Sequence, residues 1–424
     1  METDNKSETS IPFKNMNTTD LLVEAQKALI PIFSGIDTQV KSNLKKVLSA
    51  YRDCRVGVQH FASVSGYGHD DLGRDTLDRV FAQIMGAEAA VVRVQYVSGT
   101  HAIASALYGI LRPGDEMLAV AGAPYDTLEE VIGLRGSNQG SLKDFQINYR
   151  ALDLTEKGTI DWEGLTTAVK PETRLILIQR SCGYSWRESL SIADIKKIVE
   201  IVKQQNPDTV CFVDNCYGEF VDTVEPTAVG ADLMAGSLIK NPGGTIVTAG
   251  GYVAGKKELV EMAACRLTAP GIGSSSGATL DQNRLMYQGL FLAPGMVGEA
   301  IKGSHLIAYV FEQLGYPVNP APFAPRRDII QAIQLGTPKK LIAFCKAIQQ
   351  YSPVDSYVEP VPGEMPGYES QLVMAGGTFV DGSTSEFSAD GPLREPYIAF
   401  CQGGTHWTHI AIALEAAILA MNQN

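Results

Sequence analysis

The chain of 424 residues carries a net charge of -12 at pH 7; 45% of its residues are hydrophobic and 19% are charged. This length and composition are typical of a globular protein with two or three domains and large buried cores. Nucleic acids and anionic membrane surfaces reward clustered Lys and Arg, so an acidic chain without a long basic run is not expected to have either as its main partner.

The first ten residues are polar and lack the apolar core of a secretory signal, and no later apolar stretch is long enough to span a bilayer. We therefore expect a cytoplasmic protein without membrane contact.

Seven cysteines are scattered without a CxxC pair, which argues against a disulfide framework or a structural zinc site. His406 and His409 lie one helical turn apart but lack further nearby ligands, so no metal site is predicted.

Two amphipathic helices are predicted near the N-terminus, over residues 19–30 and 37–51, with Pro31 in the break between them. A proline inside a helical pattern usually ends the helix before it. We expect these elements to form an N-terminal helical arm that occupies residues 1–65.

A loop rich in Gly, Ser and Asp follows over residues 61–74, and Tyr67 within it is a candidate for function. A helix over 75–85 and a strand over 89–95 come next. Residues 98–108 then open a helix with the turn Ser-Gly-Thr. Because the first turn of a helix presents unpaired N–H groups and a partial positive charge, this turn is suited to hold a phosphate.

Three short and continuous apolar runs are typical of strands buried on both faces: 116–121, 174–179 and 209–214. Helical stretches such as 192–203 lie between some of them, which indicates a doubly wound, mostly parallel sheet. Ligands of such sheets bind outside the carboxyl ends of the strands, and Gln179, Asp214 and Lys240 all stand at such ends.

Lys240 ends an apolar run and is followed by the tight turn Asn-Pro-Gly-Gly, which no helix could cross. A lysine held this way is a candidate Schiff-base nucleophile. Asp214 could pair with a protonated pyridine nitrogen, the turn that begins at Ser98 could hold a phosphate, and Ser237 could add a hydroxyl. Together these are the groups that pyridoxal 5′-phosphate needs.

Beyond residue 295 the pattern changes, and we expect a smaller α+β domain over 296–424 after a large domain over 66–295. Its predicted elements are a helix over 296–314, a strand over 328–334, a helix over 338–350 and a strongly apolar final helix over 406–421.

Three motifs in this order resemble those of fold type I pyridoxal-phosphate enzymes of cysteine and methionine metabolism: residues 98–101, 214–220 and 237–244. The resemblance is to the methionine γ-lyase-like branch that is also labelled aluminium resistance protein or cystathionine β-lyase. It implies an α/β fold of the aspartate aminotransferase-like, pyridoxal-phosphate-dependent transferase type. Such a fold has a large domain with a mostly parallel sheet and a smaller C-terminal α+β domain.

The resemblance also implies roles for five residues at the cofactor. Lys240 would form the Schiff base with pyridoxal 5′-phosphate, and Asp214 would bind its pyridine nitrogen. Gly99 and Thr100, in the turn that begins at Ser98, would offer backbone N–H groups to the phosphate. The hydroxyl of Ser237 would help to bind the same phosphate.

Tyr125 matches the aromatic residue that stacks on the cofactor ring, and it is a candidate acid for the leaving group. Tyr67 matches a tyrosine that reaches the phosphate of the neighbouring subunit, which implies a homodimer or homotetramer with shared active sites. Arg394 is the first choice for binding the substrate carboxylate, in competition with Arg180 and Arg187.

The predicted function is that of a carbon–sulfur lyase acting on a sulfur amino acid, by elimination of the cystathionine β-lyase or the methionine γ-lyase type. Two alternatives stay open: an aminotransferase of the same fold and a non-catalytic pyridoxal-phosphate-binding protein. A nicotinamide dehydrogenase is disfavoured, because the glycine-rich loop at 271–277 lacks the third glycine of the GxGxxG fingerprint.

Overall fold

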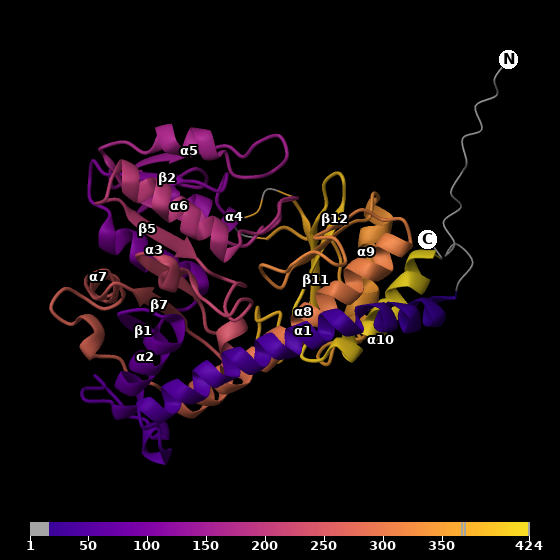
Figure 1. The fold of residues 1–424 in the computed structure, drawn as a ribbon, viewed down its shortest axis with the longest axis horizontal. Helices are drawn as coiled ribbons and strands as arrows, with labels where there is room; N and C mark the ends of the chain where they lie inside the picture. Colours follow the sequence, from indigo (N-terminus) through magenta and orange to yellow (C-terminus); the bar gives the residue numbers. More distant parts are fainter. Residues whose placement is uncertain (1–16, 366–367, 369, 423–424) are drawn as a thin grey trace.

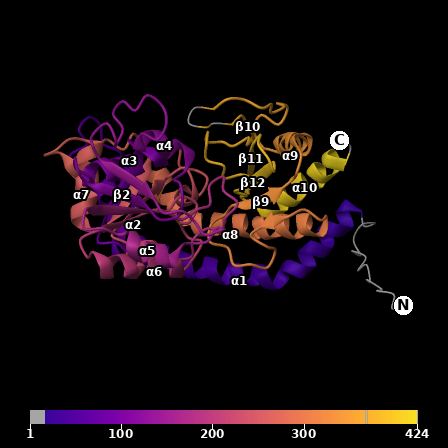
Figure 2. The same cartoon turned by 90° about the horizontal axis from the view of Figure 1, so that it is seen from above.

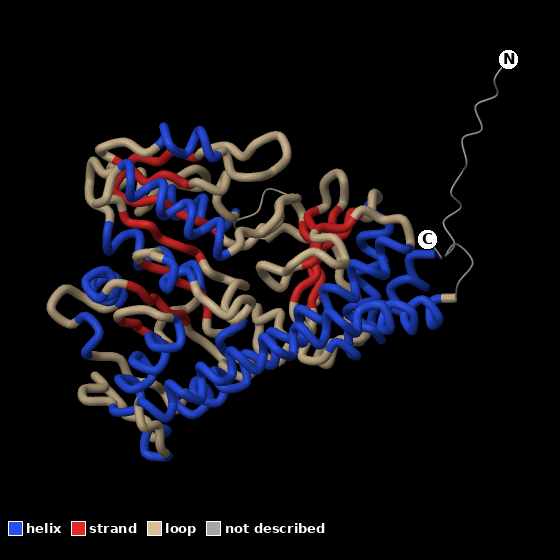
Figure 3. Tube along the Cα trace, viewed as in Figure 1, coloured by secondary structure: helices blue, strands red, loops and turns tan. Residues whose placement is uncertain are grey.

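The computed structural model describes residues 17–365, 368 and 370–422, and the polar tail predicted at residues 1–10 lies outside them. Strands gather in two separate groups, each flanked by helices (Figure 3). One group is a seven-stranded sheet and the other a five-stranded sheet. Within these described residues, no helix is long and apolar enough to cross a bilayer.

The large sheet is mostly parallel, as predicted. Its strands are β1 (Ala89–Arg93), β2 (Glu116–Ala119), β3 (Asn148–Ala151), β4 (Thr173–Gln179), β5 (Val210–Asp214), β6 (Leu233–Ser237) and β7 (Gly251–Gly255). They follow the order β1-β7-β6-β5-β4-β2-β3. Only β7 runs antiparallel to its neighbours, β1 and β6. The three apolar runs predicted as strands are β2, β4 and β5.

Helices cover both faces of the large sheet (Figure 1). They are α2 (Leu72–Met85), α3 (Gly99–Ile110), α4 (Asp126–Ile132), α5 (Trp162–Ala168), α6 (Ile192–Gln205) and α7 (Lys257–Leu267). Successive side chains of β4 enter different cores: Leu175 and Leu177 pack on one face, Ile176 and Ile178 on the other. Because both faces of the strand are buried, its sequence is a continuous run of apolar residues.

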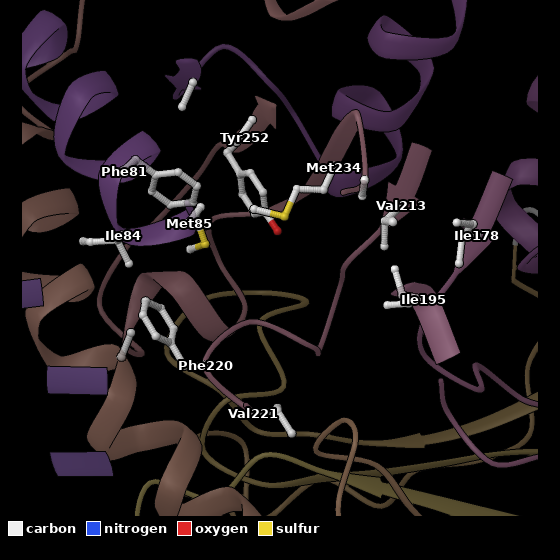
Figure 4. Packing of buried hydrophobic residues seen from close by; sticks show 14 of the residues in the cluster. Phe81, Ile84, Met85, Ile178, Ile195, Val213, Phe220, Val221, Met234 and Tyr252 are labelled. Atoms are coloured by element: carbon white, nitrogen blue, oxygen red, sulfur yellow. The ribbon is translucent and has the colours of Figure 1, made fainter. Parts of the chain in front are cut away.

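The core on one face of the sheet contains large aromatic side chains as well as aliphatic ones (Figure 4). The rings of Phe81 and Tyr252 lie with their centroids 4.7 Å apart, and Met234 and Val213 pack in the same cluster. This packing places α2 against β1 and β7, and β7 lies beside β6 in the sheet.

The N-terminal arm is a single helix, α1 (Thr18–Asp53), so the prediction of two helices was wrong. Pro31 lies inside it and is exposed, so the carbonyl group that loses its partner one turn earlier can bond to water. Buried Leu29 and Ile36 on either side pack inward, and α1 lies along the long helix α8 (Figures 1 and 2). This packing stabilises the helix through the proline.

Helix α8 (Asn283–Gln313) begins well before the predicted start at residue 296 and contains Pro294. The proposed boundary between residues 66–295 and 296–424 therefore falls inside one helix. Together α1 and α8 run along one side of both domains (Figure 1). We propose to keep the division into an arm, a large domain and a small domain, with α8 as the element shared by the two domains.

The smaller sheet is antiparallel throughout, in the order β10-β11-β12-β9-β8. Its strands are β8 (Val318–Asn319), β9 (Gln331–Gln334), β10 (Leu372–Ala375), β11 (Ser388–Pro392) and β12 (Ile398–Gln402). Helices α9 (Pro338–Gln350) and α10 (Trp407–Asn422) pack with it around a second core. Short helices complete the described elements: η1 (Val58–Phe61), η2 (Pro226–Val229), η3 (Asn241–Gly243) and η4 (Gly273–Ser275).

Candidate active site

A cavity of about 350 Å³ lies at the carboxyl ends of β4, β5 and β6 and is closed on the other side by the small domain. Gln179, Asp214 and Lys240 all line it, as expected from their places at strand ends. Strands β11 and β12 contribute residues from the small domain. The cavity is therefore built by segments far apart in the sequence.

The turn after Lys240 holds this residue at the cavity. Strand β6 ends at Ser237, and Lys240 is the residue that caps the short helix η3. The N–H of Gly243 donates to the carbonyl of Lys240 over 3.0 Å. A Cβ at Gly243 would lie only 1.9 Å from the carbonyl oxygen of Leu238, so this tight turn requires glycine.

The amine of Lys240 contacts one aromatic neighbour closely. Its Nζ donates a hydrogen bond to the hydroxyl of Tyr217 and lies 4.0 Å from the centroid of that ring. Desolvation lowers the pKa of Lys240, but Tyr217, Cys216 and Asp390 raise it, and the net result is a pKa above the ordinary value. The groups around the amine therefore favour its protonated form, which has to lose a proton before the nitrogen can act as a base.

Asp214 is the last residue of β5 and lies between β4 and β6. Its Oδ1 accepts a hydrogen bond from the N–H of Cys216 at 3.1 Å, and the Cys216 thiol also hydrogen-bonds to this carboxylate. Desolvation raises the pKa of Asp214, while the Cys216 N–H and the charge of Lys240 lower it, and the net shift is upward. A carboxylate in this setting is stabilised by a cationic ligand.

The N-terminus of α3 approaches the same cavity. Ser98 caps the helix by accepting from the N–H of His101 over 3.1 Å, while no described residue accepts from the N–H of Gly99 or Thr100. A Cβ on Gly99 would lie 3.2 Å from Cβ of Ser237, so glycine lets the helix start close to the end of β6. The two free N–H groups are available to an anion.

Tyr125 is held at the cavity by hydrogen bonds at both ends. Its N–H donates to Oε1 of Gln179 over 2.6 Å, and its hydroxyl hydrogen-bonds to that of Tyr368. Desolvation raises the pKa of the Tyr125 hydroxyl far above its ordinary range. The phenol therefore keeps its proton.

These residues fit pyridoxal 5′-phosphate. An amine, a buried carboxylate and two unbonded N–H groups at a helix start face one cavity, beside the aromatic ring of Tyr125. They match the aldehyde, the pyridine nitrogen, the phosphate and the ring face of the cofactor.

The three candidate arginines do not line this cavity. Arg394 is exposed beyond the end of β11. Arg180 is fully buried and forms an ion pair with Asp222 at 2.7 Å, and Arg187 is buried and donates to backbone carbonyls. The structure thus does not bring the predicted carboxylate ligand to the site; Arg180 and Arg187 already have partners within the fold.

Tyr67 also lies outside the cavity of its own chain, and 80% of its surface is exposed. Its backbone is tied to the N–H of Gly277, which donates to the Tyr67 carbonyl over 2.9 Å. The side chain is free to contact another subunit, and its role at a neighbouring site stays a prediction.

Several residues of the cavity were missed from the sequence. Asp390 and Gln402 come from the small sheet, and Tyr184, Tyr217 and Tyr368 come from connecting segments. Of these, only Tyr217 carried a signal, because it follows Asp214 within the motif Asp-Asn-Cys-Tyr. The others reach the site through the tertiary fold alone.

The fold, with a lysine and an aspartate at the ends of neighbouring strands, is that of fold type I pyridoxal-phosphate enzymes. The pyridoxal-5′-phosphate-dependent protein YhfS of Escherichia coli shares this fold, with a TM-score of 0.62 at 15% identity over 91% of this chain and 97% of that one.

The chain belongs to the methionine gamma-lyase family, whose model it matches over residues 18–422. It is 48% identical to YnbB of Bacillus subtilis over 97% of this chain and 99% of that protein. A carbon-sulfur lyase involved in aluminum resistance from Clostridium novyi has a TM-score of 0.91 at 48% identity, over 95% of each chain. The predicted family and the predicted class of carbon–sulfur lyase are confirmed.

Proposed function

We propose that this protein eliminates a thiol from a sulfur amino acid and that the cavity around Lys240 is its active site. The observation that carries this proposal is the convergence of Lys240, Asp214 and the free N–H groups of α3 on one cavity. These are the positions from which a fold of this type holds pyridoxal 5′-phosphate.

The chain would hold the cofactor at three points. Gly99 and Thr100 would bind the phosphate through their N–H groups, with the hydroxyls of Ser98 and Ser237 beside them. Asp214 would accept a hydrogen bond from the protonated pyridine nitrogen, and Tyr125 would pack on the ring. When bound, the cofactor supplies an electron sink for negative charge at the substrate Cα.

Two proton transfers would then be made by side chains of this protein. As the neutral amine, Nζ of Lys240 would remove the proton from the substrate Cα, and the hydroxyl of Tyr217 would hold this amine in place. The Tyr125 hydroxyl, which keeps its proton because of burial, would donate it to the departing sulfur. Removing charge from the thiolate makes it a better leaving group.

Lys240→Ala tests the assignment of the site. The variant should lose the visible absorbance of the bound cofactor and its turnover, while Lys196→Ala, an exposed lysine on α6, should keep both. Full turnover by Lys240→Ala would exclude this cavity as the active site.

The type of elimination follows from the products. The protein is incubated separately with cystathionine, cysteine and methionine, and the keto acid is identified. Pyruvate from cystathionine indicates β-elimination and 2-oxobutyrate indicates γ-elimination. Release of a thiol and ammonia without a keto-acid acceptor distinguishes a lyase from an aminotransferase, and no product under either condition would favour a non-catalytic binding protein.

We also propose a cytoplasmic homodimer or homotetramer in which Tyr67 completes the site of a neighbouring subunit. The exposure of Tyr67 supports this. Sedimentation of the protein measures the oligomeric state, and loss of cofactor affinity in Tyr67→Ala would locate the tyrosine at the site.

A further inference from the structure

Asp390 is a buried carboxylate that the assignments above leave unused. It lies in the middle of β11, opposite Phe400 of β12, and only 4% of its surface is exposed. Its side chain lines the cavity from the small domain, across from the strand ends that carry Lys240 and Asp214. A carboxylate is seldom buried this deeply without a partner of opposite charge.

Only one oxygen of this carboxylate has hydrogen-bond partners. Oδ2 accepts from Nε2 of Gln402 at 3.0 Å and from the hydroxyl of Tyr184 at 3.4 Å. No described residue donates to Oδ1. The ring of Tyr184 packs against that of Phe400, with centroids 5.2 Å apart, and shields the carboxylate on that side. Desolvation raises the pKa of Asp390 to about 7, and the charge of Lys240 lowers it, so a further cation at the unbonded Oδ1 would stabilise the ionised carboxylate.

The cavity offers no other cation for Asp390. Among the described residues that line it, Lys240 is the one basic side chain of the lysine or arginine type. The Lys240 amine is hydrogen-bonded to Tyr217 and forms no ion pair with Asp390, although its charge lowers the pKa of that carboxyl. Under the proposed function, Lys240 and Asp214 serve the cofactor, which leaves Asp390 as the charged group that faces the substrate.

We propose that Asp390 binds a second ammonium group of the substrate and so selects a sulfur amino acid that carries an amino group beyond the sulfur. The inference rests on the proposed function. The α-amine of the substrate has to reach the position of Lys240 on the large domain, whereas Asp390 lies on the opposite wall. A thioether with an ammonium at each end fits both positions, while one with a plain alkyl group leaves Oδ1 unpaired.

Two thioethers with the same scissile bond provide the test. L-cystathionine carries the distal ammonium; S-ethyl-L-cysteine, or ethionine if the γ bond is cleaved, lacks it. Wild-type kcat/KM should favour cystathionine at least about tenfold. Asp390→Asn should lower kcat/KM for cystathionine about tenfold or more and change that for the alkyl thioether less than about threefold. Asp355→Asn, an exposed position of the small domain, is the matched control.

An equal fall for both substrates, or no fall for cystathionine, would overturn the inference. A second measurement uses the wild-type protein and needs no variant: L-lysine should bind at least about tenfold more tightly than L-norleucine, which lacks the distal amine. The dissociation constants of L-lysine and L-norleucine are measured from the absorbance change of the bound cofactor. If neither thioether is cleaved, the proposed function fails, and the two dissociation constants still decide whether the cavity selects a second ammonium group; equal constants overturn the inference.

Discussion

Nζ of Lys240 lies 4.0 Å from the centroid of the Tyr217 ring and donates a hydrogen bond to its hydroxyl. Both residues belong to turns that follow neighbouring strands, β6 and β5, and Tyr217 adopts a positive φ of 69°. A tyrosine is rarely found in this region of backbone conformation unless the surrounding structure holds it there. The contact therefore positions the amine on which the proposed chemistry depends.

Tyr217→Phe should weaken turnover without removing the cofactor. The ring remains, but the amine of Lys240 loses its hydrogen-bond acceptor, so its pKa should fall and its position should loosen. We expect kcat to decrease about tenfold or more, with the cofactor absorbance retained. Tyr357→Phe, at a position that is 86% exposed, is the control. Unchanged kcat in Tyr217→Phe would show that the contact is not used.

Asp214→Asn should separate cofactor binding from catalysis. The amide has nearly the same shape but no charge to stabilise a proton on the pyridine nitrogen. We expect the bound cofactor to remain detectable by absorbance, while kcat falls on the order of 100-fold or more. A variant that keeps wild-type kcat would contradict the placement of Asp214 at the ring nitrogen.

Gly99→Ala should selectively weaken binding of the cofactor through its phosphate. The new Cβ would lie 3.2 Å from both Cβ of Ser237 and Sγ of Cys216, so the start of α3 would have to move away from β6. We expect the dissociation constant of the cofactor to rise about tenfold. Gly35→Ala is the matched control, because its Cβ meets no atom within 4 Å and alanine favours the helix. Equal cofactor affinity in both variants would show that phosphate binds elsewhere.

Glu219 should make the free energy of unfolding depend on pH. Its side chain is fully buried, Tyr252 donates to Oε1 over 2.6 Å, and Oε2 has no partner among the described residues. Desolvation raises the pKa of this carboxyl to about 8 from an ordinary value of 4.5. Between these two pH values the unfolded chain releases the proton while the folded chain keeps it, so the free energy of unfolding falls as pH rises.

Glu219→Gln removes this dependence because the amide does not titrate. At pH 5 the free energies of unfolding of the variant and the wild type should agree within about 1 kcal/mol. At pH 8 that of the variant should be higher by on the order of a few kcal/mol. Denaturant unfolding at the two pH values measures the difference. A wild type and variant with parallel pH profiles would mean that Glu219 is ionised in the folded protein.

Much of the fold follows from local patterns in the chain. Residues 174–179 were predicted as a strand because an unbroken apolar run indicates burial on both faces, and the predicted helix over 338–350 coincides with α9. The predictions that failed involved long-range packing. Pro31 looked like a helix break and a helix was predicted to begin only at residue 296, but Pro31 and Pro294 lie inside α1 and α8, which are stabilised by packing against one another.

Lys240, Asp214 and the turn at Ser98 could be found from the chain because each stands at a local signal: a strand end, a tight turn or a helix start. These signals depend on neighbouring residues and need no knowledge of the fold. Asp390 carries no such signal. It lies within a strand of the small domain and reaches the cavity because β11 faces the ends of the large sheet. The proposed cofactor positions are therefore encoded locally, whereas the carboxylate proposed to face the substrate reaches the cavity because two domains meet there.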